Sequence, residues 1–423
     1  MSQARLKYAV AMVLVLSVGG AALAARRPAA PKADAGPPPS ANAVMVSEAM
    51  DRFAFNLYGR LQGQPGNLFF SPESISTALA MAWCGARGQT AAEMEGVLGF
   101  QPDRPVRPEW VSQAYGDFLA YLKGGGAARG YELSAANAIW AQKGYGVLPD
   151  YLALLDKNFG AGLKEVDFAG DAEGARKAVN AWAEKETHEK IKDLLLPGAV
   201  QPATRVILTN AIYFKGKWTE PFKKDQTKDA DFFLAPDKKV SAPLMNLTER
   251  FPYFDGGAFQ ALEMPYAGDA LAMVILLPRE KDGLAALEKS LTAAKFAEWT
   301  AKLAKREVVV AVPRFKMTST FMLGSTLAAM GMPLAFQACN ADFKGISGGK
   351  EPFWIGEVIH KAFVDVNEEG TEAAAATAIM MLGAAMPAAP PPVFRADHPF
   401  VFLIRDKRSG CILFVGRVVN PKE

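Results

Sequence analysis

The sequence predicts an α+β protein, with helices in the first half of the chain and strands in the second. In the first half, apolar residues recur at helical spacing, as at Met50, Phe53 and Leu57. Beyond Thr204, short apolar and β-branched runs are bounded by proline and glycine. No repeat at a fixed period and no polar linker divides residues 44–423, so we expect one domain there.

The helix with the clearest ends is predicted at residues 71–85. Ser71 is a typical N-cap, Pro72 suits the first helical position, and Glu73 places an acid in the first turn. Gly85 follows the apolar run and is expected to end the helix. Further helices are expected at residues 148–159, 172–189 and 319–330.

Strands are predicted where apolar and β-branched residues cluster without helical periodicity. These runs are residues 206–208, 211–214, 271–277, 308–310 and 358–366. Near the C-terminus, two apolar runs at 400–404 and 411–415 flank a turn at 407–410 and predict a β-hairpin.

The composition is that of an ordinary globular protein, 50% hydrophobic and 22% charged over 423 residues. A net charge of +3, with no dense basic stripe, gives no indication of nucleic-acid binding. The three cysteines form no disulfide framework and no metal-binding pattern. Cys84 and Cys411 lie in apolar runs and are expected to be buried thiols.

The N-terminus has the order of a secretory signal peptide. Arg5 and Lys7 precede an apolar run at residues 8–19, and Ala22-Leu23-Ala24 provides a cleavage site after Ala24. The apolar run is short for a membrane span of about 20 residues. We therefore expect residues 1–24 to be removed and the protein to be secreted, to the periplasm or the extracellular space. Residues 25–43 are rich in alanine and proline and are expected to form a disordered tether before a domain at 44–423.

One motif suggests an enzyme. Residues 345–349 read Gly-Ile-Ser-Gly-Gly, the G-x-S-x-G pattern of hydrolases, and Asp365 and His398 would complete a triad with Ser347. The motif lacks the buried strand before it and the helix after it that a nucleophile elbow needs. His188, His360 and His398 do not stand at metal-ligand spacing, so neither metal nor other cofactor is expected.

Residues 367–392 need a further explanation. This segment follows a predicted strand, begins Asn367-Glu368-Glu369-Gly370, and continues through a run of small residues to the prolines at 387 and 390–392. The alanines suit a short surface helix, and the composition suits a linker. Neither explains the apolar residues 379–382 at its centre.

Several long segments identify a family. They are NLFFSPESIS (67–76), GARGQT (85–90), ANAIW (136–140), KIKDLL (190–195), TNAIYFKGKW (209–218), HPFVFLIRD (398–406) and FVGRV (414–418). Together these make residues 45–421 resemble a serpin. The resemblance implies about nine helices around three β-sheets, with an exposed reactive-centre loop. It further implies a monomer that inhibits serine proteases as a suicide substrate, because the cleaved loop inserts into a sheet while it carries the acyl-enzyme.

The resemblance assigns roles to individual residues. The hinge of the loop would be Glu368, Gly370, Thr371, Glu372, Ala373, Ala374, Ala375 and Ala376. Beneath the opening of the sheet, the "shutter" would comprise Ser71, Ser74, Asn210 and His360, and Trp218 would lie at the "breach" where the loop enters. In an inserted strand the small residues at 371, 373, 375 and 377 would face the packed side, where small side chains avoid overpacking.

The bond that a protease would cleave follows from counting along the loop. The count from Glu368 places it between Ala384 and Ala385, whereas the count back from the prolines places it near 388–389. We adopt the first count and expect contacts with the protease at Gly383, Ala384, Ala385 and Met386. No Arg or Lys occurs between Lys361 and Arg395, so an elastase-, chymotrypsin- or subtilisin-like target is expected.

Three alternatives remain open at this point. A serpin can lack inhibitory activity and act as a binding or chaperone protein, and it can inhibit cysteine proteases. The third alternative is the Ser347 hydrolase.

Overall fold

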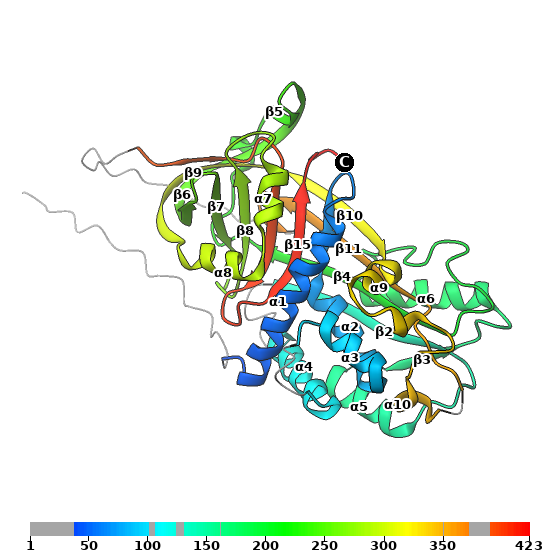
Figure 1. Ribbon diagram of the computed structural model, residues 1–423. Helices are drawn as coiled ribbons and strands as arrows, with labels where there is room; N and C mark the ends of the chain where they lie inside the picture. Colours follow the sequence, from blue (N-terminus) through cyan, green and yellow to red (C-terminus); the bar gives the residue numbers. More distant parts are fainter. Residues whose placement is uncertain (1–37, 101–105, 124–130, 161, 350, 372–389) are drawn as a thin grey trace, which may run out of the picture. The chain divides into compact units, whose positions relative to one another are not determined.

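The computed structural model describes residues 38–100, 106–123, 131–160, 162–349, 351–371 and 390–423 (Figure 1). The helices in this part of the chain are α1 (Ala41–Leu61), α2 (Pro72–Gly85), α3 (Gly88–Val97), α4 (Pro108–Lys123), α5 (Pro149–Phe159), α6 (Ala172–Glu186), α7 (Leu284–Ser290), α8 (Ala293–Ala301), α9 (Gly324–Met330) and α10 (Lys344–Ser347). The strands are β1 (Leu68–Phe70), β2 (Tyr131–Gln142), β3 (Leu163–Val166), β4 (Val206–Lys217), β5 (Lys228–Ala235), β6 (Lys238–Asp255), β7 (Phe259–Pro265), β8 (Leu271–Pro278), β9 (Ala304–Pro313), β10 (Phe315–Met322), β11 (Glu357–Asn367), β12 (Gly370–Thr371), β13 (Val393–Arg395), β14 (Phe400–Asp406) and β15 (Ile412–Val418). Two short 3₁₀ segments, η1 (Lys224–Gln226) and η2 (Pro333–Phe336), complete the described elements.

The larger sheet has nine strands in the order β1-β15-β14-β8-β7-β6-β9-β13, with β5 paired to β6. The predicted C-terminal hairpin is confirmed, because β14 and β15 pair antiparallel. Phe69 stacks on Phe402 and Phe414, with ring centroids 5.8 and 5.1 Å apart, and so fixes β1 to the hairpin. The C-terminal strands therefore lie in the interior of the protein.

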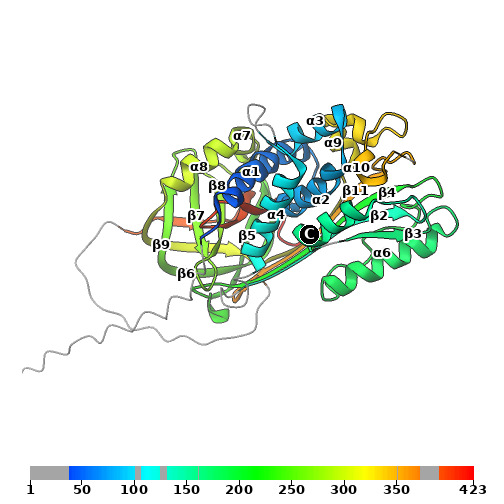
Figure 2. The same ribbon diagram turned by 90° about the horizontal axis from the view of Figure 1, so that it is seen from below.

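The smaller sheet has six strands in the order β10-β11-β12-β4-β2-β3. One face of it packs on the main core, where the buried helix α2 lies against β2 and β4. The other face is covered by α6 (Figure 2). It carries a second apolar cluster, which contains Ala175, Val179 and Ala183 of α6 together with Ala138 and other residues of the strands. Alternate residues of β2 thus enter different cores, as the two-residue period of a strand requires.

The ends of α2 are as predicted. The Ser71 hydroxyl accepts a hydrogen bond from the Ser74 amide at 3.2 Å, Pro72 opens the helix, and Gly85 is its last residue. Buried Cys84 and Cys411 are likewise confirmed, since they are 3% and 0% exposed.

The structure corrects three of the expected boundaries. The predicted helix at 319–330 is wrong in its first part, because Ser319 to Met322 belong to β10 and pair with β11, leaving the helix to begin at Gly324. The helix expected at 172–189 ends at Glu186, and the next turn holds His188 and Glu189 at positive φ. The first helix begins at Ala41, inside the expected tether, because the Ser40 hydroxyl caps it by accepting from the Ala43 amide.

The predicted α+β fold class is confirmed, and the strands of the described residues pair into two sheets. The long strand β6 pairs with β5 over its first part, with β9 from Leu244 to Tyr253, and with β7 at its end. It thereby joins strands into one sheet that would otherwise form separate ones. Ten α-helices lie in the same residues, against about nine expected.

Candidate functional site

The central feature of the six-stranded sheet is the direct pairing of β4 with β11. The two strands run parallel and are in register over seven residue pairs, from Ile207 with Glu357 to Tyr213 with Phe363. Beyond these pairs the strands separate, and β12 lies between them. Gly370 and Thr371 pair antiparallel with Lys217 and Gly216 on one side, and with Asn367 and Val366 on the other. We call the β4–β11 interface the slot; it is open at this end and closed over the rest.

Gly370 is required where β12 begins. Its φ of +149° is a conformation that residues with a side chain rarely adopt. A Cβ atom there would lie only 2.0 Å from the carbonyl oxygen of Gly216. Glycine therefore allows the chain to turn back from β11 and enter the slot.

Thr371 is buried between the two strands, on the side of the main core. Its hydroxyl lies 2.9 Å from the Tyr266 hydroxyl, so this polar group has a partner in the interior. Tyr266 in turn stacks on Trp218, with ring centroids 4.6 Å apart. The Trp218 indole N–H donates to the Asn367 carbonyl at 2.9 Å, which holds the turn before β12 in place.

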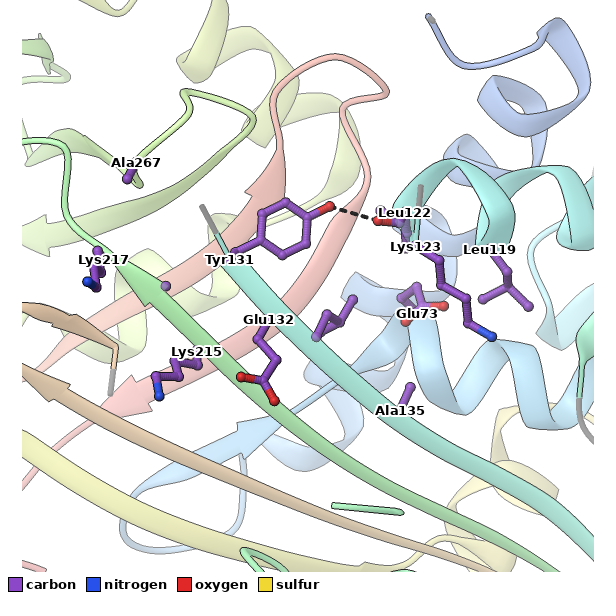
Figure 3. A pocket seen from close by; sticks show the side chains of 12 residues that line it. Glu73, Leu119, Leu122, Lys123, Tyr131, Glu132, Ala135, Lys215, Lys217 and Ala267 are labelled. Carbon is purple, nitrogen blue, oxygen red and sulfur yellow. Dashed lines mark hydrogen bonds between the residues drawn. The ribbon is translucent and has the colours of Figure 1, made fainter. Parts of the chain in front are cut away.

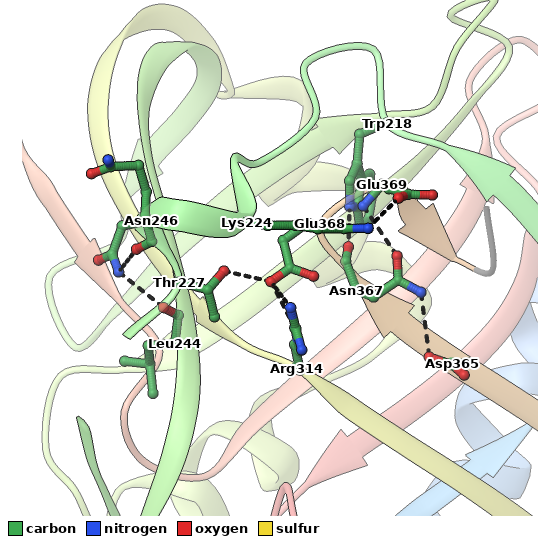
Figure 4. A network of polar contacts seen from close by, with 11 residues as sticks. Trp218, Lys224, Thr227, Leu244, Asn246, Arg314, Asp365, Asn367, Glu368 and Glu369 are labelled. Atoms are coloured by element: carbon green, nitrogen blue, oxygen red, sulfur yellow. Dashed lines mark hydrogen bonds and ion pairs between the residues drawn. The ribbon is translucent and has the colours of Figure 1, made fainter. Parts of the chain in front are cut away.

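The turn before β12 is also held by charge (Figure 4). The Glu368 carboxylate is buried and accepts hydrogen bonds from the Arg314 guanidinium and the Thr227 hydroxyl. Burial by itself would raise the pKa of Glu368, but these hydrogen bonds, together with a backbone hydrogen bond and the positive charge of Arg314, hold the pKa below its usual value. The neighbouring Glu369 forms an ion pair with Lys224 of η1 at 2.8 Å. We call Trp218, Thr227, Arg314, Asn367 and Glu368 the breach network.

A second polar cluster lies under the closed part of the slot. Asn210 of β4 and His360 of β11 face each other in register, and His360 Nδ1 is hydrogen-bonded to Asn210 Oδ1. The Asn210 amide N–H donates to Ser74 Oγ and Asn137 Oδ1, and Ser74 Oγ donates to Asn137 Oδ1 at 3.0 Å. All of these side chains are buried, and Ser71 completes the group, which we call the shutter cluster.

The hydrogen bonds of His360 define its protonation. The Ser71 amide can only donate, so His360 Nε2 accepts from it at 3.1 Å and the ring proton lies on Nδ1. Burial lowers the pKa of His360 to about 3, which keeps the ring neutral. The shutter cluster is thus a set of neutral, mutually satisfied groups, and it has no reacting atom.

The structure brings Ser71, Ser74, Asn210 and His360 together, and it places Trp218 beside Glu368, Gly370 and Thr371. Glu372, Ala373, Ala374, Ala375, Ala376, Gly383, Ala384, Ala385 and Met386 lie outside the described residues. Sequence reasoning missed Asn137, Tyr266, Thr227 and Arg314. Asn137 carried a signal, since it is a polar residue inside the apolar strand run 136–141, whereas the other three become visible only once distant strands meet.

The hydrolase triad does not form. The Ser347 hydroxyl is buried and donates to the Glu351 carbonyl at 3.1 Å. His398 contacts Asp397 through Nδ1 and the Pro278 carbonyl through Nε2, at 2.9 and 2.8 Å. Asp365 pairs with Lys316 at 3.6 Å. Each member has other partners, so no base is available to Ser347.

A pocket of about 680 Å³ lies between α4 and the start of β2, next to Gly216 at the open end of the slot (Figure 3). Leu119, Leu122 and Leu133 contribute to its walls. Its one buried acid is Glu73, whose pKa burial raises to about 7 although the Thr77 hydroxyl donates to it. Exposed Lys123 and Glu132 also line the pocket, and the positive charge of Lys123 lowers the pKa of Glu73 without outweighing its burial.

Comparisons with known proteins agree with this geometry. The family model described as Serpin (serine protease inhibitor) matches residues 48–421. The chain is 41% identical to an uncharacterized serpin-like protein of Thermococcus kodakarensis over 379 residues, covering 89% of this chain and 86% of that protein. It is also 41% identical to the human leukocyte elastase inhibitor over 386 residues, covering 89% of this chain and 99% of the inhibitor.

Solved structures show the same fold. Serpin48 of the insect Tenebrio molitor superposes with a TM-score of 0.78 at 35% identity, covering 89% of this chain and 98% of that one. Human thyroxine-binding globulin complexed with thyroxine gives a TM-score of 0.81 at 29% identity, covering 90% and 100%. The protein belongs to the serpin family.

The buried neutral His360 predicts a specific pH dependence. Its pKa is lower in the folded protein than in the unfolded chain, where it is near 6.5. Its contribution to stability is therefore complete above about pH 6.5 and is lost as the pH falls toward 3, by up to about 1.4 kcal/mol per pH unit. Urea unfolding of wild type and His360→Gln should give stabilities whose difference narrows progressively below pH 6.5. A constant difference at every pH would contradict this protonation state.

The Arg314–Glu368 pair predicts a stability effect at the breach. Arg314→Met leaves a buried carboxylate without its charged partner, which should lower the free energy of unfolding by about 2 kcal/mol. Adding Glu368→Gln to this variant should restore part of the loss. The control is Lys239→Met, which removes an exposed pair with Asp231 and should change stability by less than about 0.5 kcal/mol. If Arg314→Met and the control substitution lower the free energy of unfolding equally, Arg314 does not stabilise the protein through the buried Glu368 carboxylate.

Proposed function

We propose that this serpin inhibits serine proteases by inserting its cleaved loop into the slot. The observation that carries the proposal is β12, a two-residue strand that already occupies the open end between β4 and β11. The target serine hydroxyl adds to the carbonyl carbon of the residue before the cleaved bond. The peptide bond breaks, the amine of the next residue leaves with a proton, and an acyl ester joins the loop to the protease. Extension of β12 then moves that ester away from the entry point.

The register of β12 predicts which residues of β4 and β11 each inserted loop residue would pair with. Thr371 pairs with Gly216 and Val366, so Thr377, six residues further on, would pair with Asn210 and His360, each six residues back. Insertion separates Asn210 from His360 and breaks their hydrogen bond. A threonine hydroxyl at this position can supply a new partner to both. Thr377 is the only residue with a hydroxyl group between Glu372 and Met386. That it would be inserted at the level of the shutter cluster supports the proposal.

The same register bears on the cleaved bond. The slot ends at Val206 and Glu357, which would pair with residues 381 and 380 of the loop. Ala384 would then lie just beyond the last pairs, where an attached protease has room outside the sheet. This placement favours the bond between Ala384 and Ala385 over the one near 388–389.

The residues around that bond indicate the target class. Gly383, Ala384, Ala385 and Met386 are small or apolar, which suits proteases with shallow or apolar primary pockets. Relatives named leukocyte elastase inhibitor point to the same class. We propose an elastase-, chymotrypsin- or subtilisin-like target, with the inhibitor acting as a monomer and without a cofactor.

We also propose that the protein is exported, on the basis of the signal-like order of residues 1–24. Among the described residues, no helix is long and apolar enough to cross a membrane.

Incubation with elastase or subtilisin should give an inhibitor–protease band that survives denaturing electrophoresis. N-terminal sequencing of the released C-terminal peptide should begin at Ala385. Cleavage without any stable complex, by every protease tried, would identify a non-inhibitory member of the family.

Two variants test the insertion face. Thr371→Arg places a charge in the buried slot beside Tyr266 and should convert the inhibitor into a substrate that is cleaved and released. Glu372→Arg changes a residue expected on the opposite face and should leave the number of inhibitor molecules consumed per protease nearly unchanged. Similar behaviour of both variants would refute the assigned register.

Export predicts a defined mature end. The full-length chain expressed in its source organism should be recovered outside the cytoplasm with Ala25 as its first residue, as found by N-terminal sequencing. An intact Met1 on the recovered protein would contradict signal-peptide cleavage.

A further inference from the structure

An aromatic and cationic cluster lies at the closed end of the slot, opposite the breach. The Arg205 guanidinium carbon lies 5.8 Å from the ring centre of Tyr145 and 5.9 Å from that of Trp354. All three side chains are half-buried. Arg205 immediately precedes β4, Trp354 comes shortly before β11, and Tyr145 follows β2, so the contacts join the ends of three strands.

Arg205 belongs to the β4 side of the slot. Its guanidinium donates to the carbonyls of Pro202 and Thr204, both at 2.9 Å. Its own carbonyl accepts from the Gln142 amide at the end of β2 at 2.8 Å. Trp354 lies on the β11 side, so the Arg205–Trp354 contact crosses the slot.

A backbone hydrogen bond crosses at the same level. The Gly356 amide donates to the Val206 carbonyl at 2.8 Å. A Cβ atom on Gly356 would lie 2.9 Å from that oxygen, so glycine permits this close approach. The closed end is therefore held by this main-chain hydrogen bond, by the Arg205–Trp354 contact and by an edge-on contact of Phe353 with Tyr145, whose ring centroids lie 5.9 Å apart.

We infer that Arg205 and Trp354 form a clamp that controls the last step of loop insertion. This inference rests on the function proposed above. Adjacent strands lie about 4.8 Å apart, and a strand inserted between them roughly doubles that distance. The hydrogen bonds of Arg205 to the Pro202 and Thr204 carbonyls keep it on the β4 side, so its contact with Trp354 must break.

The register of β12 predicts how many loop residues would be inserted before the Arg205–Trp354 contact has to break. Val206 and Gly356 would both face residue 381, and Arg205 would face Leu382. Residues 371–379 can enter without reaching this level, because residue 379 pairs with Leu208. The clamp thus opposes only the final residues before Ala384. Arg205 and Trp354 are positioning residues in this reaction, since they act by determining how far the loop travels.

The test uses two synthetic peptides that compete with the protein's own loop. One has the sequence of residues 371–384 and reaches the clamp, and the other has the sequence of residues 371–379 and does not. Uptake of each peptide is followed by native electrophoresis and by loss of protease inhibition. The variants are Trp354→Ala, Trp354→Phe and Arg205→Ala.

Removing a half-buried cation–π contact should speed full insertion of the longer peptide by about two- to five-fold in Trp354→Ala and Arg205→Ala. Trp354→Phe, which retains an aromatic face, should show a smaller change. Uptake of the shorter peptide should have the same rate in all variants. Arg306→Ala is the matched control, because Arg306 lies 5.8 Å from the Tyr253 ring in the other sheet and does not border the slot.

Three results would overturn the inference, and they differ from one another. Equal rates for the longer peptide in wild type and Trp354→Ala would show that the contact does not oppose insertion. Equal acceleration of both peptides would show that the substitutions loosen the whole slot. If wild type takes up neither peptide and forms no complex with a protease, insertion itself, and with it the proposed function, is wrong.

Discussion

The direct pairing of β4 with β11 is the interaction on which the site depends. Seven parallel pairs close the slot, while β12 keeps its other end open. Parallel pairing is slightly less stable per residue than antiparallel pairing. A strand inserted here would replace each parallel pair with two antiparallel ones. The sheet with β4 paired directly to β11 therefore has fewer and weaker backbone pairings than the same sheet would have with a strand inserted between them.

Three sets of contacts lie along this slot and differ in chemistry. At the breach, Arg314 neutralises a buried carboxylate, so the contacts there are ionic. The shutter cluster is neutral, and the two hydrogen bonds of His360 in it depend on one ring tautomer. At the closed end, Arg205 lies between two aromatic rings. In the proposed insertion a strand would meet them in this order, so substitutions in each set should affect different stages of that process.

Local signals in the sequence predicted those features that depend on neighbouring residues. The capped start of α2 at Ser71 and the C-terminal hairpin are examples. The strand nature of Ser319 to Met322 was missed because it arises from pairing with β11, about 40 residues away. The shutter residues came from family resemblance, whereas Asn137 and Arg314 were identified only when strands distant in sequence were brought together. Local patterns in the sequence do not indicate which distant strands pair, so these contacts could not be predicted from it.

Gly370 and Thr371 have a kinetic consequence. Ordering the first residues of any hydrogen-bonded structure costs conformational entropy before enough bonds form to compensate, so nucleation is slower than growth. In β12 these residues are already fixed between their two neighbours. Lengthening of this strand is then propagation from an existing nucleus. In the proposed mechanism this lengthening would compete with hydrolysis of the acyl ester that joins the loop to the protease. Its rate would depend on how readily the seven β4–β11 residue pairs separate one after another and pair with the inserted strand.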